Sequence, residues 1–215
     1  MRRTAAEAEE TRRSIIATAR ASFTSRGYAA TSTTDLVESI HLTRGALYHH
    51  FADKEALFET VFMELVQELD DAVTGAATAA APKGVRAAIV AGALACIEFM
   101  DRVDYRQIVV VDGPAVLGLD RWHQIDGEAG LHSMEQALEL LATEGQLEVP
   151  VSAALVRALF GALTELSLGH ARGELTTADA IGAFELVLDR LGPNASPPAR
   201  SSTARSSTKR KTAVQ

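Results

Sequence analysis

The sequence predicts an all-α protein, and three observations carry this prediction. Apolar residues recur at helical spacing along most of the chain. Ala, Leu and Val dominate an apolar fraction of 47%, whereas aromatic residues make up only 5%, a composition that favours helices. Ser, Thr, Asp and Gly stand where helices would begin and end. We expect about nine helices, divided into an N-terminal three-helix domain (residues 1–53), a larger helical domain (54–193) and a tail (194–215).

The N-terminal domain has a start or stop signal at each predicted helix end. The first helix should run from about residue 8 to 26, with Gly27 placed to stop it. Ser32, Thr43 and Asp53 are each placed to cap the next helix in turn, because their side-chain oxygens can accept hydrogen bonds from free backbone N–H groups.

Residues 31–57 predict a helix-turn-helix, the arrangement that places a small helix in a DNA groove. Two apolar clusters at helical spacing flank a turn at residues 39–42; they are Leu36, Val37 and Ile40, and then Leu42, Leu47 and Phe51. The second helix would present short or polar residues without a carboxylate, as an approach to phosphate requires; these are Thr43, Arg44, Gly45, Ala46, Tyr48 and His49.

Each of these residue types suits a particular DNA contact. Arg44 could read a guanine or pair only with phosphate, and both alternatives stay open. Gly45 would allow close backbone approach, and Ala46 could meet a thymine methyl group. We expect Tyr48 and His49 to bind phosphates, although Tyr48 would also suit a core position with its hydroxyl at the surface.

The same stretch resembles the TetR-type transcriptional regulators, closely so over about residues 12–58. The resemblance rests on a string of short motifs, which are Arg26-Gly27-Tyr28, Ala30-Thr31-Ser32, Thr43-Arg44-Gly45, Leu47-Tyr48-His49-His50-Phe51 and Lys54-Glu55-Ala56-Leu57. It implies further DNA-backbone contacts from Thr31, Thr34 and Lys54. His41 stands where the family usually has Gly, so a left-handed backbone is expected there on a residue other than Gly.

Charge is distributed unevenly along the chain, which carries a net −7. Residues 1–54 hold eight Lys/Arg against six Asp/Glu, residues 55–193 hold eight against twenty-two, and the tail holds five against none. The acidic excess lies in the middle block, so the local field at the helix-turn-helix can still attract phosphate.

The larger domain should contain helices at about residues 54–74, 85–102, 104–112, 119–144, 152–171 and 178–191. The run Ile108-Val109-Val110-Val111 alone would suit a strand, but the helical context favours a helix. The last two helices have wide apolar faces that predict a dimer interface, with Leu155, Leu159, Leu163, Leu166, Ile181, Phe184 and Leu188. The alternative is that these faces pack within one chain; the family resemblance favours the dimer.

The resemblance also implies a small-molecule pocket among the middle helices. Its candidate lining consists of the large side chains at suitable depth, which are Phe62, Phe99, Met100, Tyr105, Trp122 and Met134. The alternative is that each of these is plain core, because large apolar and aromatic side chains fill cores by default. The polar run Asp120 to Gln124 could orient an apolar or amphipathic ligand.

Several other classes of protein are disfavoured. One cysteine, Cys96, allows no disulfide within the chain, there is no secretory signal, and no stretch is apolar enough to span a membrane, so we expect a cytoplasmic protein. His123 and His132 lie on opposite sides of their helix, about 180° apart, so they cannot share a metal ion. No phosphate-binding loop or nucleophile elbow is present, so we expect no enzyme activity, no cofactor and no metal.

The sequence thus predicts a homodimeric regulator, most simply a repressor, that binds a palindromic DNA operator and is released by a small molecule. The alternative is a small-molecule-binding or enzymatic helical domain whose helix-turn-helix is vestigial. We expect the basic tail to be disordered and to attract DNA without specificity.

Overall fold

A computed structural model describes residues 5–193, apart from the side chains of residues 126 and 129, and confirms the all-α prediction. The expected tail falls outside the described residues. The described residues form ten α-helices, which are α1 (Ala5–Ala30), α2 (Thr33–Ser39), α3 (Arg44–His50), α4 (Lys54–Ala80), α5 (Val85–Phe99), α6 (Val103–Tyr105), α7 (Gly113–Leu117), α8 (Leu119–Thr143), α9 (Ala153–Ala171) and α10 (Thr177–Leu191). Two further helical turns join these helices. The turn η1 (Ala81–Lys83) is a 3₁₀ turn, tighter than an α-helix, and η2 (Arg106–Asp112) is a π-helical turn, wider than an α-helix.

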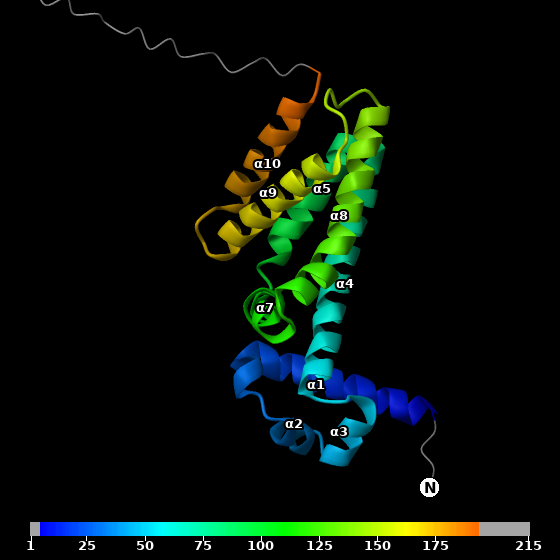
Figure 1. Ribbon diagram of the computed structural model, residues 1–215, viewed down its shortest axis with the longest axis vertical. Coiled ribbons are helices and arrows are strands. Elements are labelled where there is room, and N and C mark those ends of the chain that lie inside the picture. The colour runs from blue at the N-terminus through cyan, green and yellow to red at the C-terminus, as the bar shows by residue number, and fades with distance from the viewer. Residues whose placement is uncertain (1–4, 194–215) are drawn as a thin grey trace, which may run out of the picture.

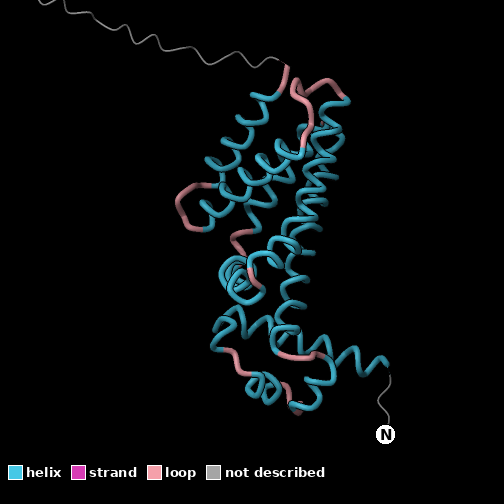
Figure 2. The backbone as a smooth tube through the Cα atoms, viewed as in Figure 1, coloured by secondary structure: helices cyan, strands magenta, loops and turns pink. Residues whose placement is uncertain are grey.

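The helices form two stacked bodies that share α4 (Figure 1). Helix α1 lies across one end of the molecule with α2 and α3 beneath it, and α4 rises from there into a bundle with α5, α8, α9 and α10. The loops are short, and the longest lie between α8 and α9 and between α9 and α10 (Figure 2).

All three predicted helix caps are confirmed. The hydroxyl of Ser32 accepts from the N–H of Thr34, and that of Thr43 accepts from the N–H of Ala46, each at 3.2 Å. The carboxylate of Asp53 accepts from the N–H of Ala56 at 2.7 Å. These bonds fix the starts of α2, α3 and α4, and α2 and α3 have only seven residues each, too few to be stable alone.

Two residues with positive φ shape the N-terminal domain. Gly27 has φ 76° and breaks the helical path of α1, where the sequence predicted a stop. His41 has φ 56°, the left-handed conformation expected at the turn between α2 and α3.

The core has two parts, and the first one crosses the predicted boundary between residues 53 and 54. Leu57, Phe58 and Leu65 of α4 are fully buried together with side chains of α1, α2 and α3 and with Tyr105 and Ile108 from the η2 region. The second part lies between α5, α8, α9 and α10. Helix α4 is therefore packed into the N-terminal domain at its start and leads into the bundle at its end.

The segment 104–112 is helical, as predicted, but it is wound as a π-helix over Arg106–Asp112. The structure places the Asp112 carboxylate against the break in α1, where it accepts from the backbone N–H of Tyr28 at 2.8 Å. The Gln107 amide donates to the same oxygen at 3.2 Å. The η2 turn thereby joins the end of α1 to the second body.

Gly113 marks a close approach that leads to a stability prediction. A methyl group there would lie 2.8 Å from Phe62 and 2.9 Å from Trp122, whose indole N–H is bound to the carbonyl of Val109. Gly113→Ala should lower stability by about 1–3 kcal/mol through overpacking, measured by urea unfolding. Gly75→Ala is the matched control, because its added methyl meets nothing within 4 Å and a helical Gly→Ala change should stabilise slightly. Equal effects of both changes would contradict the close packing.

Candidate nucleic-acid interface and interior cavity

Helix α3 presents most of the predicted DNA-contact residues to solvent. Thr43, Arg44, Gly45 and His49 are exposed, and Tyr48 is 43% exposed. Ala46 is half-buried, whereas Leu47 on the opposite side is fully buried and holds the helix on the core. The fold therefore places one polar, carboxylate-free face of a short helix at the tip of the molecule (Figure 1).

Tyr48 and Arg44 act as a pair on this face. The Arg44 guanidinium carbon lies 5.8 Å from the centre of the Tyr48 ring, within the range of a cation–π contact. Hydrogen bonds to Arg44 and to Thr33 lower the pKa of the Tyr48 hydroxyl. Thr33, at the start of α2, was missed by the sequence reasoning, because its proximity to Tyr48 depends on how α2 crosses α3.

Thr31 and Lys54 are turned inward, unlike the placement that the family resemblance implied. Thr31 is 2% exposed and its hydroxyl donates to the carbonyl of Gly27 at 2.8 Å. The Lys54 ammonium donates to the carbonyls of Tyr28 and Thr31 at 2.8 and 3.0 Å, and it lies 4.0 Å from the centre of the Tyr28 ring. Lys54 thereby ties the start of α4 to the end of α1, which explains a cation in the first turn of a helix. Thr34, at the start of α2, is half-buried.

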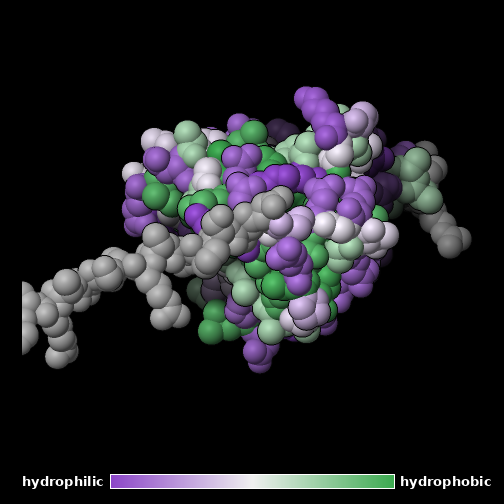
Figure 3. Space-filling view, turned by 90° about the horizontal axis from the view of Figure 1, so that it is seen from above, coloured by the Kyte–Doolittle hydropathy of each residue, from purple (hydrophilic) through white to green (hydrophobic). Residues whose placement is uncertain are grey.

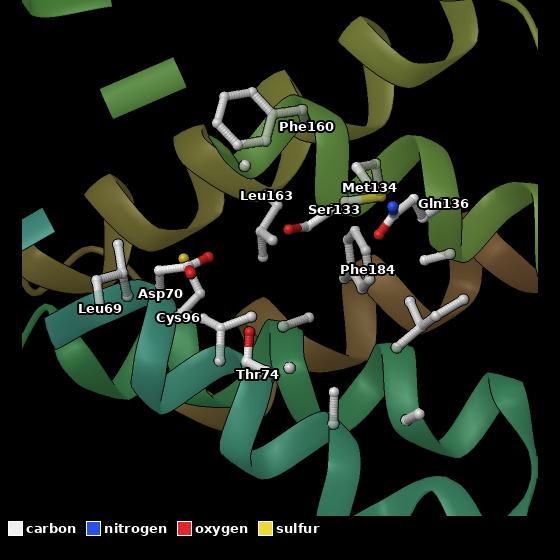
Figure 4. A pocket seen from close by; sticks show the side chains of 18 of the residues that line it. Leu69, Asp70, Thr74, Cys96, Ser133, Met134, Gln136, Phe160, Leu163 and Phe184 are labelled. Carbon is white, nitrogen blue, oxygen red and sulfur yellow. The ribbon is translucent and has the colours of Figure 1, made fainter. Parts of the chain in front are cut away.

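A cavity of about 520 Å³, partly open to solvent, lies in the second body, between α4, α5, α8, α9 and α10. Its wall is mainly apolar, with Ile89, Ala93, Leu163 and Phe184 among the lining residues. Figure 4 shows polar side chains on two sides of the cavity. Asp70 and Thr74 lie on the side of α4, and Ser133 and Gln136 lie on the side of α8. A space of this volume can hold a small organic molecule.

Half of the predicted pocket residues line this cavity. Met100, Tyr105 and Met134 do, whereas Phe62, Phe99 and Trp122 pack against the first core. The predicted polar run at residues 120–124 also lies elsewhere, with Arg121 bound to Glu59 on α4. The size of a side chain does not distinguish a cavity wall from a core. Most of this wall consists of smaller side chains, which no sequence pattern singles out.

The predicted dimer residues divide into two groups. Leu159, Leu163, Phe184 and Leu188 are buried in the second core of a single chain, and Leu155, Leu166 and Ile181 are half-buried beside it. The outer faces of α9 and α10 instead expose small and apolar residues, which include Ala158, Gly161, Gly182, Leu186 and Val187.

An ion-pair cluster connects α1 with α4 and with the start of α6. Arg20 donates to Glu68 of α4 at 2.9 Å and to Asp104 of α6 at 2.7 Å. Arg102 bonds the same two carboxylates, each at 2.8 Å. Burial alone raises the pKa of Asp104, but the hydrogen bonds from Arg102 and Arg20 outweigh it and bring the pKa to about 2. All four groups are therefore charged at neutral pH and hold α1, α4 and α6 together.

Within the part of the chain that the structure describes, no helix is long and apolar enough to cross a membrane, and no three described His, Cys, Asp or Glu side chains gather as metal ligands would. The parts that do come together are a polar recognition helix, a shared α4 and a cavity behind it. They define a helix-turn-helix DNA-binding protein with a second, cavity-containing helical domain. Sequence comparison places the chain in a particular family: residues 15–61 match the profile described as "Bacterial regulatory proteins, tetR family", and residues 86–191 match "Tetracyclin repressor-like, C-terminal domain".

A solved structure of a TetR-family transcriptional regulator from Pectobacterium atrosepticum is 33% identical to the chain, with a TM-score of 0.72. The match covers 88% of this chain and 98% of that one. The chain therefore belongs to the TetR family of transcriptional regulators, which are DNA-binding proteins and not enzymes.

Two curated relatives match over about a third of the chain. The probable acrEF/envCD operon repressor of Escherichia coli K12 is 40% identical over 73 residues, which are 31% of this chain and 33% of the relative. The regulator TtgR of Pseudomonas putida is 41% identical over 70 residues, 33% of each chain. The chain thus spans about a third of the length of these relatives in the matched region, and what they regulate stays specific to them.

The inward placement of Lys54 leads to a testable prediction. Lys54→Met removes two hydrogen bonds to backbone carbonyls and should destabilise the protein by about 2 kcal/mol, lowering the thermal midpoint by about 4–8 °C in circular dichroism. Lys83→Met is the control, since Lys83 is exposed at the far end of α4. An unchanged midpoint for Lys54→Met, combined with equally weakened binding to all DNA sequences, would instead make Lys54 a phosphate contact.

Proposed function

We propose that this regulator is a repressor that binds a palindromic operator as a homodimer and leaves it when a small apolar or amphipathic molecule occupies the cavity. The observation that carries this proposal is the position of α4. Its first turns belong to the core that they share with α1, α2 and α3, and its later turns form one wall of the cavity. A molecule in the cavity therefore touches the same helix that supports the recognition helix.

The mechanism is a shift between two populations. Two α3 helices must lie about one turn of DNA apart, roughly 34 Å, to enter two half-sites. A ligand that favours a different position of α4 would favour a different spacing, and it lowers DNA affinity by its difference in affinity for the two states. The Arg20 ion pairs and the bond from Tyr28 to Asp112 would carry the shift, because they join α1 to α4, α6 and η2.

We place the dimer interface on the exposed faces of α9 and α10. Leu159 and Phe184 are buried in the core of one chain, so they are not available for a partner. The outer face of α9 exposes Ala158 and Gly161. The outer face of α10 keeps Leu186, which is 56% exposed. Small residues allow helices to approach closely, and pairing both helices across a two-fold axis would give a four-helix bundle. Figure 3 shows further apolar side chains between polar ones at the end of the bundle away from α1–α3, so exposure alone does not select the interface.

The DNA contact of Arg44 can be tested on an operator selected from random duplexes with the wild-type protein. Arg44→Ala should weaken binding to this operator by about 1–3 kcal/mol and relax the preference at one base position in each half-site, measured by fluorescence anisotropy. Its thermal midpoint should not change, because Arg44 is exposed. Lys83→Ala is the control for loss of one positive charge. An equal loss on specific and random DNA would reduce Arg44 to a phosphate contact.

The dimer proposal predicts the effect of a charge on the outer face of α10. Leu186→Glu should give monomers in sedimentation and abolish operator binding, while circular dichroism shows an intact fold. Leu119→Glu is the matched control, since Leu119 is 63% exposed but lies on α8. Phe184→Glu cannot serve here, because it would place a charge in the monomer core and unfold the chain. A Leu186→Glu protein that stays dimeric would place the interface elsewhere.

A further inference from the structure

The charge of the cavity wall indicates which molecules it would accept. The described lining residues include one carboxylate, that of Asp70 on α4, and they include no Lys, Arg or His. Thr74 and Thr78 follow Asp70 at intervals of four, so all three lie along one stripe of α4 that faces the cavity. The wall therefore combines a large apolar area with one negative charge.

The Asp70 carboxylate also differs from its neighbours on α4. Glu68 is bound by Arg20 and Arg102, and Asp71 accepts from the amide of Gln67 at 3.0 Å. No hydrogen bond or ion pair joins the Asp70 side chain to the parts of the chain that the structure describes. Figure 4 shows its side chain beside Leu69 and Cys96 at one side of the cavity, with Phe184, Met134 and Gln136 at the other.

A half-buried carboxylate of this kind favours a cationic hydrogen-bond donor. Bonds between an ammonium group and a carboxylate are about twice as strong as neutral ones, and apolar surroundings weaken competition from water. The aromatic rings of Phe160, Tyr105 and Phe184 in the same wall also favour a cation over an anion. The excess of acidic residues in 55–193, twenty-two against eight basic ones, would raise the local concentration of cations.

We propose that the effector is an amphipathic organic cation whose amine or ammonium group binds Asp70 and whose apolar body lies along α4 and α5 toward Val85 and Ile89. The lining residues on this side run from Val66 to Ala81, about 22 Å of helix at 1.5 Å per residue, which suits an elongated molecule. This inference rests on the proposed function, since it identifies the class of molecule that the cavity would detect.

The test compares three probes with one carbon skeleton and different charge. Isothermal titration calorimetry with the full chain, without DNA, would measure 4-phenylbutylamine, 4-phenylbutanol and 4-phenylbutyrate. We expect the wild type to bind the amine at least about tenfold more tightly than the alcohol, and the acid most weakly. Asp70→Asn should remove most of the preference for the amine, whereas the matched control Asp71→Asn should keep it, because Asp71 is exposed and lies outside the cavity.

Two further measurements make each outcome decisive. Ala88→Phe should fill part of the cavity and weaken all three probes, while circular dichroism reports whether each variant folds. Equal binding of amine and alcohol, an unchanged preference in folded Asp70→Asn, or no binding of the amine would each overturn the inference.

Operator release separates this inference from the proposed function. If the amine binds in an Asp70-dependent way but leaves the protein on its operator, the charge assignment stands and the regulatory role of the cavity fails. If a neutral compound releases the operator and Asp70→Asn does not change its effect, the regulatory role stands and the charge assignment fails.

Discussion

The bonds that Arg20 makes with Glu68 and Asp104 are the interaction on which the arrangement of the two bodies depends. Arg20 comes from the helix that supports the DNA-binding surface, and its two partners come from α4 and α6. The cluster is half-buried, and both of its arginines are shared between both carboxylates. Separating α1 from α4 or α6 would leave half-buried charges without their partners, which costs free energy. The cluster therefore favours motion of α1 together with α4 and α6.

Much of the N-terminal domain was predictable, because local rules determine it. Ser32, Thr43 and Asp53 cap their helices, and His41 takes a left-handed conformation, as their positions in the sequence indicated. Lys54 was interpreted differently, since its two carbonyl partners lie 26 and 23 residues earlier in the chain. A family pattern gives the residue type at such a position but not whether the side chain faces DNA or the protein.

The second body was predictable as a set of helices but not as a site. Periodicity identified the helix at 104–112, yet no local signal distinguishes a π-helical turn from an α-helical one. Large side chains such as Phe62 and Trp122 were expected around a pocket and instead fill the first core. Empty space forms where several helices fail to meet, which depends on their crossing angles, and small residues such as Ala88 and Gly92 line it.

The inward position of Lys54 bears on how operator preference can evolve in this protein. Exposed residues on α3, such as Arg44 and Gly45, can change identity while the caps and Leu47 keep the helix in place. Lys54 and Thr31 are hydrogen-bonded to the backbone at the end of α1. Mutations there therefore alter the packing of the N-terminal domain as well as its affinity for DNA. Mutations at the exposed positions of α3 can therefore change the preferred DNA sequence alone, whereas mutations at Thr31 and Lys54 also change the packing of the N-terminal domain. Two homologous chains would then differ in the DNA sequence that they recognise while keeping the hydrogen bonds of Thr31 and Lys54 to the end of α1.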